Sequence, residues 1–575
     1  MALRSSGRPT AKHPLEHIVI NDFRYGIVSN IRAGASGGGI FDAPKPGMAQ
    51  EGTIGCIANE TGQLVPLPIG QSIGTVTCGA SGYTPSGPVN TCGVATAGPI
   101  YLSPTQTYND DIFIITQFIG THSAASYEYF QTFVVKPDGS NVTAQLFQGL
   151  AGTTIQPRGC TFAHTRARTS NFTNPGSPLM AWEVTSGRPF TDGSMGQYLA
   201  WPDPASPTVD FPYAQSYTVN GGSAIWGGQI LAHDGRILRL AEQRLAFGSS
   251  AWFETNELVR YTDPPNSLDL STNATDSVLD PQIPGGYGSW GSITFGELLL
   301  VKRSGGALLI MGDVYAPQIT RLEGIASVGD MMNKATSCPD GMIYCVENDG
   351  AYMWAGGATS QKINTINDQF HTMDVLMQFG RKCDHTLWNN WVVFSNGWLY
   401  DSVNNSWWQL LDNLFTGTAS RRIQWLAAGK GSAQYLWCVG GSGKNSNSDP
   451  NIEYVRYDRS TQGQSYTWIS QPLPVSLMQT IDVHEIEIGI TNVSPNTQLL
   501  IQLDTIDGTT SSSEPVIIHN GSSRPIRVRL PIGIRGNSIT VTYSVSGPGP
   551  APTTNEIIVG YMEAGPYGQA PGQEP

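Results

Sequence analysis

The chain has 575 residues, with 32 basic and 45 acidic side chains that give a net charge of −13. A chain of this length exceeds what one hydrophobic core supports, so at least two structural units are expected. The acidic balance makes the chain a poor general nucleic-acid binder, because phosphate contacts require Lys and Arg. Only 13% of the residues are charged and 66 are Gly, which favours many short strands joined by tight turns.

The first segment, residues 1–52, is predicted to be an extended N-terminal arm and linker, polar and mobile over its first 20 or so residues. It lacks the apolar core of a secretory signal, and no run of 18 apolar residues occurs, so no membrane span is expected. Residues 53–68 then read as a hairpin with a turn at Asn59-Glu-Thr-Gly62.

A strand–turn–strand rhythm begins near residue 110. Its clearest turns contain Gly and are His233-Asp-Gly235, Ser304-Gly-Gly306, Asn348-Asp-Gly350 and Ser395-Asn-Gly397. Asn-Gly and Asp-Gly between apolar runs predict hairpins, because such turns need positive φ. About seven meanders follow one another, one per ~50 residues, which is typical of propeller blades. Residues 53–477 are therefore predicted to be β-propeller-like, with stacked β-sandwiches as the rival architecture.

One helix is predicted within this region. Asn367 and Asp368 offer an N-cap, and apolar residues follow at three- and four-residue spacings: Phe370, Met373, Leu376, Met377 and Phe379. We expect this helix to cover an apolar sheet edge between two blades.

Strict alternation of apolar and polar residues marks the last part of the chain. It predicts five strands, which are 481–490, 498–503, 526–530, 539–545 and 557–561. The first strand alternates with one slip, which indicates a bulge. Period-two patterning means one buried and one wet face, so 478–563 is predicted to be a C-terminal β-sandwich and 564–575 a disordered tail. Arg527, Arg529, Thr540 and Thr542 are expected on the wet faces. The fold class is thus all-β.

The eight cysteines are widely spaced, at 56, 78, 92, 160, 338, 345, 383 and 438. No Cys-x-x-Cys pair occurs, so a zinc site is not indicated. Buried free thiols are the expected state.

No specific catalytic constellation is present, so we expect no catalytic residue, no cofactor and no metal. A pair of carboxylates for glycoside cleavage stays open, because such pairs come from distant strands; Asp313, Glu347 and Asp349 are interchangeable candidates. The remaining polar groupings read as turns, loops or strand surface: Asn348–Trp354, Ala428–Ser432, Cys160 with His164, Cys383 with His385, and His484 with Glu485 and Glu487. The 14 Trp and 22 Tyr are expected in the blade core, with sugar stacking as the alternative.

The stretch from Ser327 to Trp408 resembles part of a known protein family. It contains Cys338-Pro-Asp-Gly-Met-Ile-Tyr-Cys-Val-Glu-Asn-Asp-Gly350, Tyr352-Met-Trp-Ala-Gly-Gly357, Lys362–Phe370, and Trp391-Val-Val-Phe followed by Trp398-Leu-Tyr-Asp401 and Trp408. This order of blade, short helix and blade resembles the tail nozzle and tail-hub (tail tubular) proteins of short-tailed bacteriophages. The early Phe23-Arg-Tyr-Gly-Ile27 and Gly55–Pro68 are similar to entry segments of that family.

The resemblance implies a non-enzymatic structural protein located in the virion tail. It would form a homo-oligomeric ring, usually a hexamer, that passes DNA through a channel without binding it specifically and joins an adaptor to tail fibres or spikes. An acidic wall is consistent with a channel that must release DNA. Two alternatives stay open: a receptor- or carbohydrate-binding virion protein, and a propeller-fold glycoside hydrolase.

Overall fold

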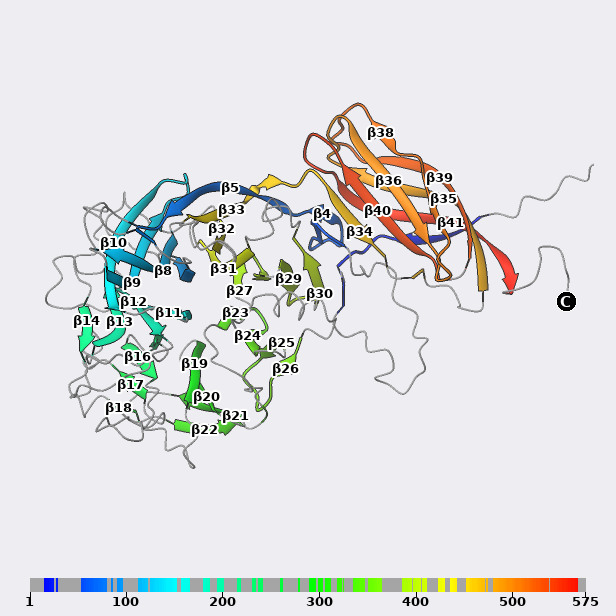
Figure 1. Cartoon of the computed structure of the whole chain (residues 1–575). Coiled ribbons are helices and arrows are strands. Elements are labelled where there is room, and N and C mark those ends of the chain that lie inside the picture. Colours follow the sequence, from blue (N-terminus) through cyan, green and yellow to red (C-terminus); the bar gives the residue numbers. More distant parts are fainter. Residues whose placement is uncertain are drawn as a thin grey trace, which may run out of the picture. The chain divides into compact units, whose positions relative to one another are not determined.

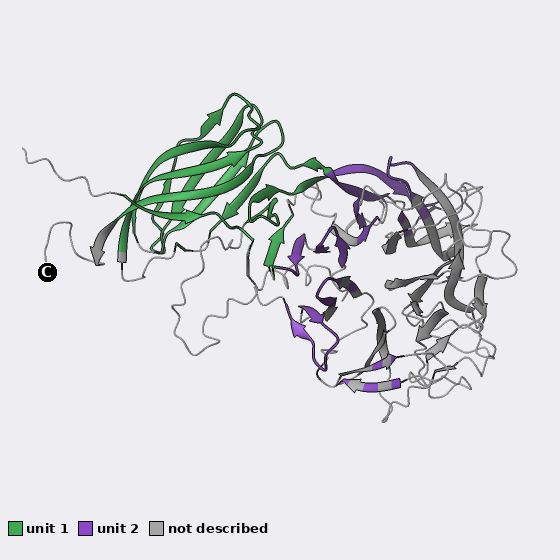
Figure 2. Ribbon diagram, turned by 180° about the vertical axis from the view of Figure 1, so that it is seen from behind, with its two compact units in different colours: residues 1–69, 404–411, 460–575 green, residues 70–403, 412–459 purple. Residues whose placement is uncertain are grey.

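The computed structural model describes residues 15–28, 53–79, the strands given below between 84 and 363, 385–410, 422–429, 435–441 and 451–566, with short gaps inside these ranges. The chain divides into two compact units. Unit 1 contains 1–69, 404–411 and 460–575, and unit 2 contains 70–403 and 412–459 (Figure 2). Every regular element of the described residues is a β-strand, so the predicted all-β class is confirmed (Figure 1).

Unit 2 is built from successive antiparallel meanders. The first three sheets are formed by β6 (Thr84–Pro85), β7 (Asn90–Thr96), β8 (Ile112–His122), β9 (Ala125–Val135) and β10 (Asn141–Ala151); by β11 (Pro157–Thr165), β12 (Leu179–Ser186), β13 (Ser194–Ala200) and β14 (Gln215–Thr218); and by β15 (Ile230–His233), β16 (Arg236–Leu240), β17 (Val259–Tyr261) and β18 (Val278–Leu279).

The next sheets continue the same pattern. The fourth is β19 (Ser289–Phe295), β20 (Leu298–Arg303), β21 (Gly306–Met311) and β22 (Gln318–Leu322); the fifth is β23 (Ala335–Cys338), β24 (Gly341–Val346), β25 (Gly350–Trp354) and β26 (Gln361–Lys362); and the sixth includes β27 (His385–Trp388), β28 (Trp391–Phe394) and β29 (Trp398–Asp401). The seventh joins β31 (Arg422–Ala428), β32 (Leu436–Gly441) and β33 (Asn451–Gln462) to β5 (Pro68–Thr77).

One edge strand from each of these seven sheets takes part in a closed circle. These strands are β7, β11, β15, β19, β23, β27 and β31; each contacts the next, and β31 contacts β7. A circle of four-stranded meanders is the arrangement of a β-propeller, which confirms the propeller-like prediction and excludes stacked sandwiches for this unit. The circle is visible in the strands coloured blue to yellow, β7 to β33, in Figure 1.

The circle is closed by a segment from the N-terminal side of the unit. Strand β5 is the last strand of the seventh sheet, whose other strands come from residues 422–462. Ser72 Oγ donates to Glu453 Oε1 (2.9 Å), and Thr77 Oγ1 donates to Asn451 Oδ1 (2.7 Å). Beneath them, buried apolar side chains of the first and seventh sheets pack into one core that contains Val76, Ile114, Phe133, Trp437 and Val439.

Hairpins form where the sequence predicts them. His233 pairs with Arg236, Arg303 with Gly306, and Val346 with Gly350 across three hairpins. The fourth turn joins β28 to β29, and there Gly397 has φ of 90°, a conformation that costs a side-chain-bearing residue about 1 kcal/mol or more. The predicted helix at 367–379 lies outside the described residues.

Unit 1 is a β-sandwich of two sheets. The first sheet contains β3 (Cys56–Ala58), β4 (Leu64–Pro66), β41 (Thr553–Pro566), β35 (Gln479–Thr491) and β39 (Ile526–Gly536), with β1 (Glu16–Ile20) also on β41. The second contains β34 (Tyr466–Ile469), β40 (Thr540–Ser546), β36 (Thr497–Asp504), β37 (Thr510–Ser512) and β38 (Val516–Ile518). The unit also holds the pair β2 (Ile27–Val28) and β30 (Ser406–Gln409).

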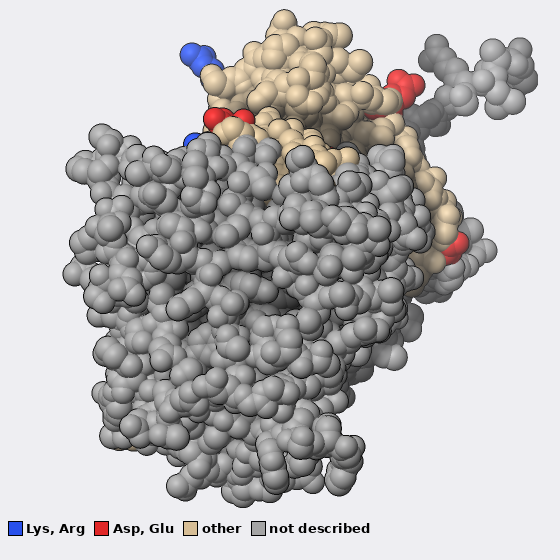
Figure 3. All heavy atoms as spheres, turned by 60° about the vertical axis from the view of Figure 1, so that its left-hand side comes forward, with Lys and Arg blue, Asp and Glu red and all other residues tan. Residues whose placement is uncertain are grey.

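The sandwich follows its alternating pattern closely. Every second residue of β36 and β40 is buried, and the predicted bulge lies between Val483 and Glu485 of β35. Arg527 and Arg529 are exposed on β39, as expected, whereas Thr540 and Thr542 lie half-buried on the other sheet. On the side drawn in Figure 3, charged side chains of the described residues are few and scattered.

Two N-terminal segments differ from expectation. Residues 16–20, predicted to be mobile, form β1 and pair with residues 557–561 of β41, because β41 offers a free edge that an extended segment can complete. The hairpin predicted at 53–68 is confirmed, with Gly62 N–H donating to Asn59 O at 3.0 Å. Its strands β3 and β4 extend the sandwich sheet through Leu64 and Thr554. The predicted domain boundaries stay a prediction.

The interior of the sandwich holds a network of hydroxyl groups. Tyr466 Oη donates to Pro552 O (3.2 Å) and lies 2.7 Å from Thr554 Oγ1, which donates to Tyr543 Oη (3.2 Å). All these groups are buried. Buried polar atoms need partners, and the network supplies them between the two sheets.

Replacing Tyr466 with Phe is therefore expected to lower the free energy of unfolding by about 1–3 kcal/mol, because Pro552 O and Thr554 Oγ1 lose a buried partner. Urea unfolding of the full chain followed by circular dichroism measures this. The control is Ile517→Ala at an exposed site of β38 (49% exposed), for which a change within about 0.5 kcal/mol is expected. Equal midpoints for the two variants would contradict the prediction.

Alkaline pH is expected to destabilise unit 1. Burial raises the pKa of Tyr466 and of Tyr543 far above the usual value of about 10. The folded state keeps both phenols protonated, so their stabilising effect is complete below the unfolded pKa and falls as pH rises above it. Each group contributes a loss of up to about 1.4 kcal/mol per pH unit. Unfolding midpoints measured from about pH 8 to about pH 11 should fall above about pH 10, and less steeply in Tyr466→Phe; a flat profile contradicts the prediction.

Candidate functional site

Polar side chains meet where the fifth and sixth sheets of unit 2 adjoin. Their inner strands β23 and β27 contact each other, and Thr336 Oγ1 of β23 lies 2.7 Å from His385 Nδ1 of β27. Both residues are buried. A buried imidazole needs a hydrogen-bonding partner, and Thr336 gives His385 one across the boundary between two blades. This contact links the fifth sheet to the sixth sheet, and the titratable groups described next belong to the same two sheets.

A thiol and a phenol lie at the end of this boundary. Cys338, the last residue of β23, donates its S–H to Gly341 O (3.3 Å). Burial raises the pKa of Cys338. Burial also raises the pKa of Tyr400 on β29 far above its usual value, and the nearby Cys338, Asp340 and Asp401 raise it further. Both groups therefore stay protonated and neutral at neutral pH.

Two carboxyl groups from neighbouring sheets complete the group. Asp340 is exposed in the turn between β23 and β24, and Asp401 is buried at the end of β29 (5% exposed). Asp401 Oδ1 accepts the Val403 N–H at 3.1 Å, which also orders the turn after the strand. We call Cys338, Asp340, Tyr400 and Asp401 the junction cluster. The cluster contains one solvent-exposed acid, Asp340, one buried acid, Asp401, and the protonated phenol of Tyr400, whose pKa both acids raise.

The three carboxylates singled out from the sequence, Asp313, Glu347 and Asp349, lie outside the described residues. Sequence reasoning did not find the junction cluster, because each of its two acids stands at a turn, where an Asp has an ordinary structural explanation. Asp340 stands in Pro339-Asp-Gly341, and Asp401 ends an apolar strand. Only the adjacency of two sheets brings them together, and sequence spacing carries no signal of that adjacency.

The other groupings from the sequence have structural explanations where they are described. Residues 350–354 form β25, which pairs with β24 as a hairpin, and Ala428 is the last residue of β31. His484 is exposed on β35, while Glu485 and Glu487 pair with Arg529 at 3.5 and 3.7 Å. The hairpin and strand-surface interpretations are confirmed, whereas residues 430–432 of the predicted loop lie outside the described residues. The side chains of Cys160, His164 and Cys383 lie outside the described part.

Among the described residues, no group of three or more His, Cys, Asp or Glu side chains is placed to hold a metal ion. No helix there is long and apolar enough to cross a membrane. The cysteines with described side chains, Cys56, Cys78, Cys338 and Cys438, are buried free thiols, as expected.

Six tryptophan side chains of the described residues lie in the core. Trp354, Trp388, Trp407, Trp408, Trp437 and Trp468 are all fully buried. A ring that stacks on a sugar must expose a face, so these six side chains cannot be sugar-binding platforms. The prediction that the aromatic residues form the core is confirmed for them.

Comparison with known proteins found no matching family model and no matching curated protein. Solved structures do match. An exo-beta-1,3-galactanase from Phanerochaete chrysosporium has 12% identity and a TM-score of 0.27, with 84% of this chain and all of that chain covered. A glycoside hydrolase family 43 arabinoxylan arabinofuranohydrolase from Bacillus subtilis has 9% identity, a TM-score of 0.26 and coverage of 79% and 93%. Apo AztD from Citrobacter koseri has 11% identity, a TM-score of 0.31 and coverage of 70% and 96%.

These matches correct the function expected from the sequence. The prediction was a non-enzymatic tail subunit, whereas the matching structures include glycoside hydrolases and none of those named here is a tail protein. At such identities a likeness concerns the fold and assigns no substrate. The resemblance to tail nozzle proteins, the partners it implies and the virion location are not touched by any comparison and stay predictions.

Proposed function

We propose that this chain is a glycoside hydrolase whose acid and base are the two carboxyl groups of the junction cluster, Asp340 and Asp401. The observation that carries the proposal is that two acids from adjacent sheets act on one buried tyrosine: after burial itself, Asp340 and Asp401 both raise the pKa of Tyr400. Glycosidases use two Asp or Glu residues on either side of the scissile bond. The low TM-scores of the matching hydrolases give this assignment no weight.

The reaction needs one proton donor and one proton acceptor. One carboxyl group gives its proton to the glycosidic oxygen as the bond to the anomeric carbon breaks. The other carboxylate takes a proton from the water whose oxygen bonds to that carbon, so a sugar and an alcohol leave and the pair of acids has exchanged its protons. Asp340 is open to solvent and Asp401 is buried, so the two carboxyl groups differ in their access to water.

The neighbouring groups would position this pair. Tyr400 keeps its hydroxyl proton and can donate a hydrogen bond to a carboxylate or a sugar oxygen. The Thr336–His385 contact holds the inner strands of the two sheets together. Catalytic geometry depends on such supporting contacts, since a displacement of about 1 Å costs about a hundredfold in rate.

The test is hydrolysis by the purified full chain. A panel of nitrophenyl glycosides and neutral polysaccharides is incubated with the protein, and released nitrophenol and new reducing ends are measured. The proposal expects turnover of at least one substrate class that is abolished when the protein is heat-unfolded. Absence of turnover across the panel, with a correctly folded protein, would overturn it.

A further inference from the structure

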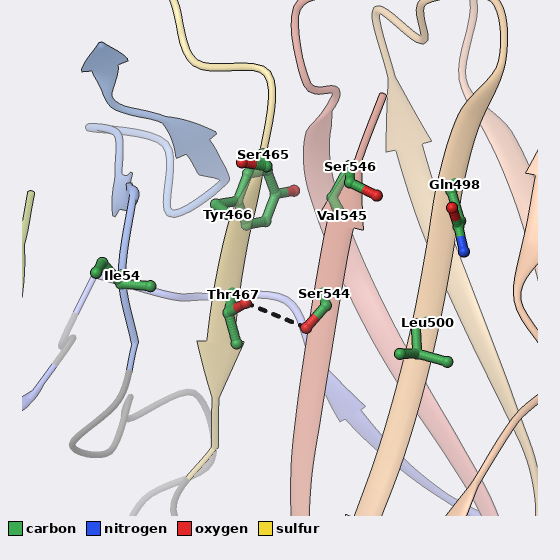
Figure 4. A pocket seen from close by; sticks show the side chains of 9 residues that line it. All are labelled: Ile54, Ser465, Tyr466, Thr467, Gln498, Leu500, Ser544, Val545 and Ser546. Carbon is green, nitrogen blue, oxygen red and sulfur yellow. Dashed lines mark hydrogen bonds between the residues drawn. The ribbon is translucent and has the colours of Figure 1, made fainter. Parts of the chain in front are cut away.

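Unit 1 contains a pocket that is separate from the junction cluster. Its volume is about 250 Å³, and nine residues line it: Ile54, Ser465, Tyr466, Thr467, Gln498, Leu500, Ser544, Val545 and Ser546 (Figure 4). The pocket lies on the outer face of the second sandwich sheet, where β34, β40 and β36 run side by side. Ile54 borders it through paired backbone hydrogen bonds with Thr467 (2.8 and 3.0 Å).

The register of the strands explains which side chains meet there. Thr467 is opposite Ser544, and Ser544 is opposite Leu500. Gln498 is opposite Ser546 in the next row. Because alternate residues of a strand point to opposite faces, these five side chains share the outer face, while Tyr543 and Leu499 point into the core. The alternation of side chains along each strand thus determines which residues line the pocket.

The pocket offers hydrogen-bonding groups without charge. Thr467 Oγ1 and Ser544 Oγ lie 3.1 Å apart and leave further donor and acceptor capacity open. Within the described residues the amide of Gln498 and the hydroxyl of Ser546 make no hydrogen bond to protein, so both can bind a ligand. No Asp, Glu, Lys, Arg or His lines the pocket.

From this chemistry we propose that the pocket binds one ring of a neutral saccharide. Hydroxyl and amide side chains match the donors and acceptors of sugar hydroxyls, and Ile54 and Leu500 give the apolar surface against which sugar C–H groups pack. The volume is slightly below the ~300 Å³ at which drug-sized pockets begin, so a single ring fits. A charged ligand is disfavoured, because nothing in the lining compensates its charge.

The proposal is independent of catalysis. Binding at the sandwich needs neither Asp340 nor Asp401, and a full chain carrying Asn at both positions can be assayed in place of the wild type. Failure of hydrolysis would leave the binding result untouched, and failure of binding would leave the hydrolysis result untouched. The two proposals therefore stand or fall separately.

Saturation-transfer NMR of the full chain with methyl β-galactopyranoside, methyl β-glucopyranoside and methyl α-mannopyranoside tests the pocket, with glucuronic acid as the charged counterpart. We expect signals from at least one neutral glycoside with a Kd of about 1 mM, a typical weak affinity, and weaker signals from glucuronic acid. The double variant Gln498→Ala/Ser544→Ala should weaken binding at least tenfold. The matched control is Thr542→Ala, which removes a hydroxyl from the same face of β40 outside the pocket and should bind like the wild type.

A second variant covers the case in which the double variant loses its fold. Leu500→Arg keeps every hydroxyl and amide but places a long charged side chain in the pocket, and it should also abolish binding. Circular dichroism and the urea midpoint check folding. Absence of signal from all three neutral glycosides, or equal signals from wild type and from the folded pocket variants, would overturn the proposal.

Discussion

Replacing Trp437 with Ala is expected to lower the free energy of unfolding of unit 2 by about 3–5 kcal/mol, the usual cost of removing a large buried aromatic side chain. Trp437 lies on β32 and is fully buried in the core shared by the first and seventh sheets. Its ring packs against Tyr454 and Tyr435, with ring centroids 6.2 and 6.5 Å away. The cavity would thus open where the circle of blades is closed.

The position of the cavity makes this effect large. The seventh sheet contains β5, which comes from far away in the sequence, and its attachment depends on packing as well as on the hydrogen bonds of Ser72 and Thr77. Tyr454 Oη also donates to Gly139 O (2.7 Å), in the turn between β9 and β10 of the first sheet. Loss of Trp437 removes apolar packing from the core that lies next to the hydrogen bonds of β5 and of Tyr454.

Urea unfolding followed by circular dichroism measures the change, since fluorescence would lose one of its reporters. The control variant is Val403→Ala in the same unit, where the side chain is 67% exposed and a change within about 0.5 kcal/mol is expected. A loss below about 1 kcal/mol for Trp437→Ala would mean that this core does not hold the circle closed.

The second large effect concerns catalysis. Asp340→Asn and Asp401→Asn are each expected to lower kcat on the best substrate of the panel by about 10²–10⁴-fold, the range that general acid–base groups contribute. Asn is nearly the same size as Asp and keeps an oxygen that accepts a hydrogen bond, so the Val403 N–H keeps its partner in Asp401→Asn. Folding should be preserved while proton transfer is lost.

This choice of variant separates a catalytic role from a structural one. If Asp401 only orders its turn, Asn replaces it with little change in rate. The control is Asp507→Asn, an exposed turn acid of unit 1 whose carboxylate accepts the Thr509 N–H at 3.1 Å, for which hydrolysis should stay at the wild-type rate. Full activity in both junction variants would show that other carboxylates perform the reaction; Asp313, Glu347 and Asp349 would then be tested in the same way.

The local elements follow from the sequence because their causes are local. In the sequence, Gly235, Gly350 and Gly397 stand between apolar runs, and the hairpins β15–β16, β24–β25 and β28–β29 form at these places. Alternation along residues 497–504 and 540–546 separates a buried from an outer face without reference to any partner. The slip at residue 484 appears as a bulge in the register of β35 with both of its neighbours.

Tertiary structure decided the pairings that join distant parts of the chain. The sequence does not indicate that β5 completes the seventh sheet or that β1, β3 and β4 extend the sandwich, because any extended segment can pair with an open edge and the choice depends on which edges remain free after folding. The junction cluster has the same origin: Asp340 and Asp401 are 61 positions apart, and they share one site because two blades that each form locally become neighbours in a closed circle.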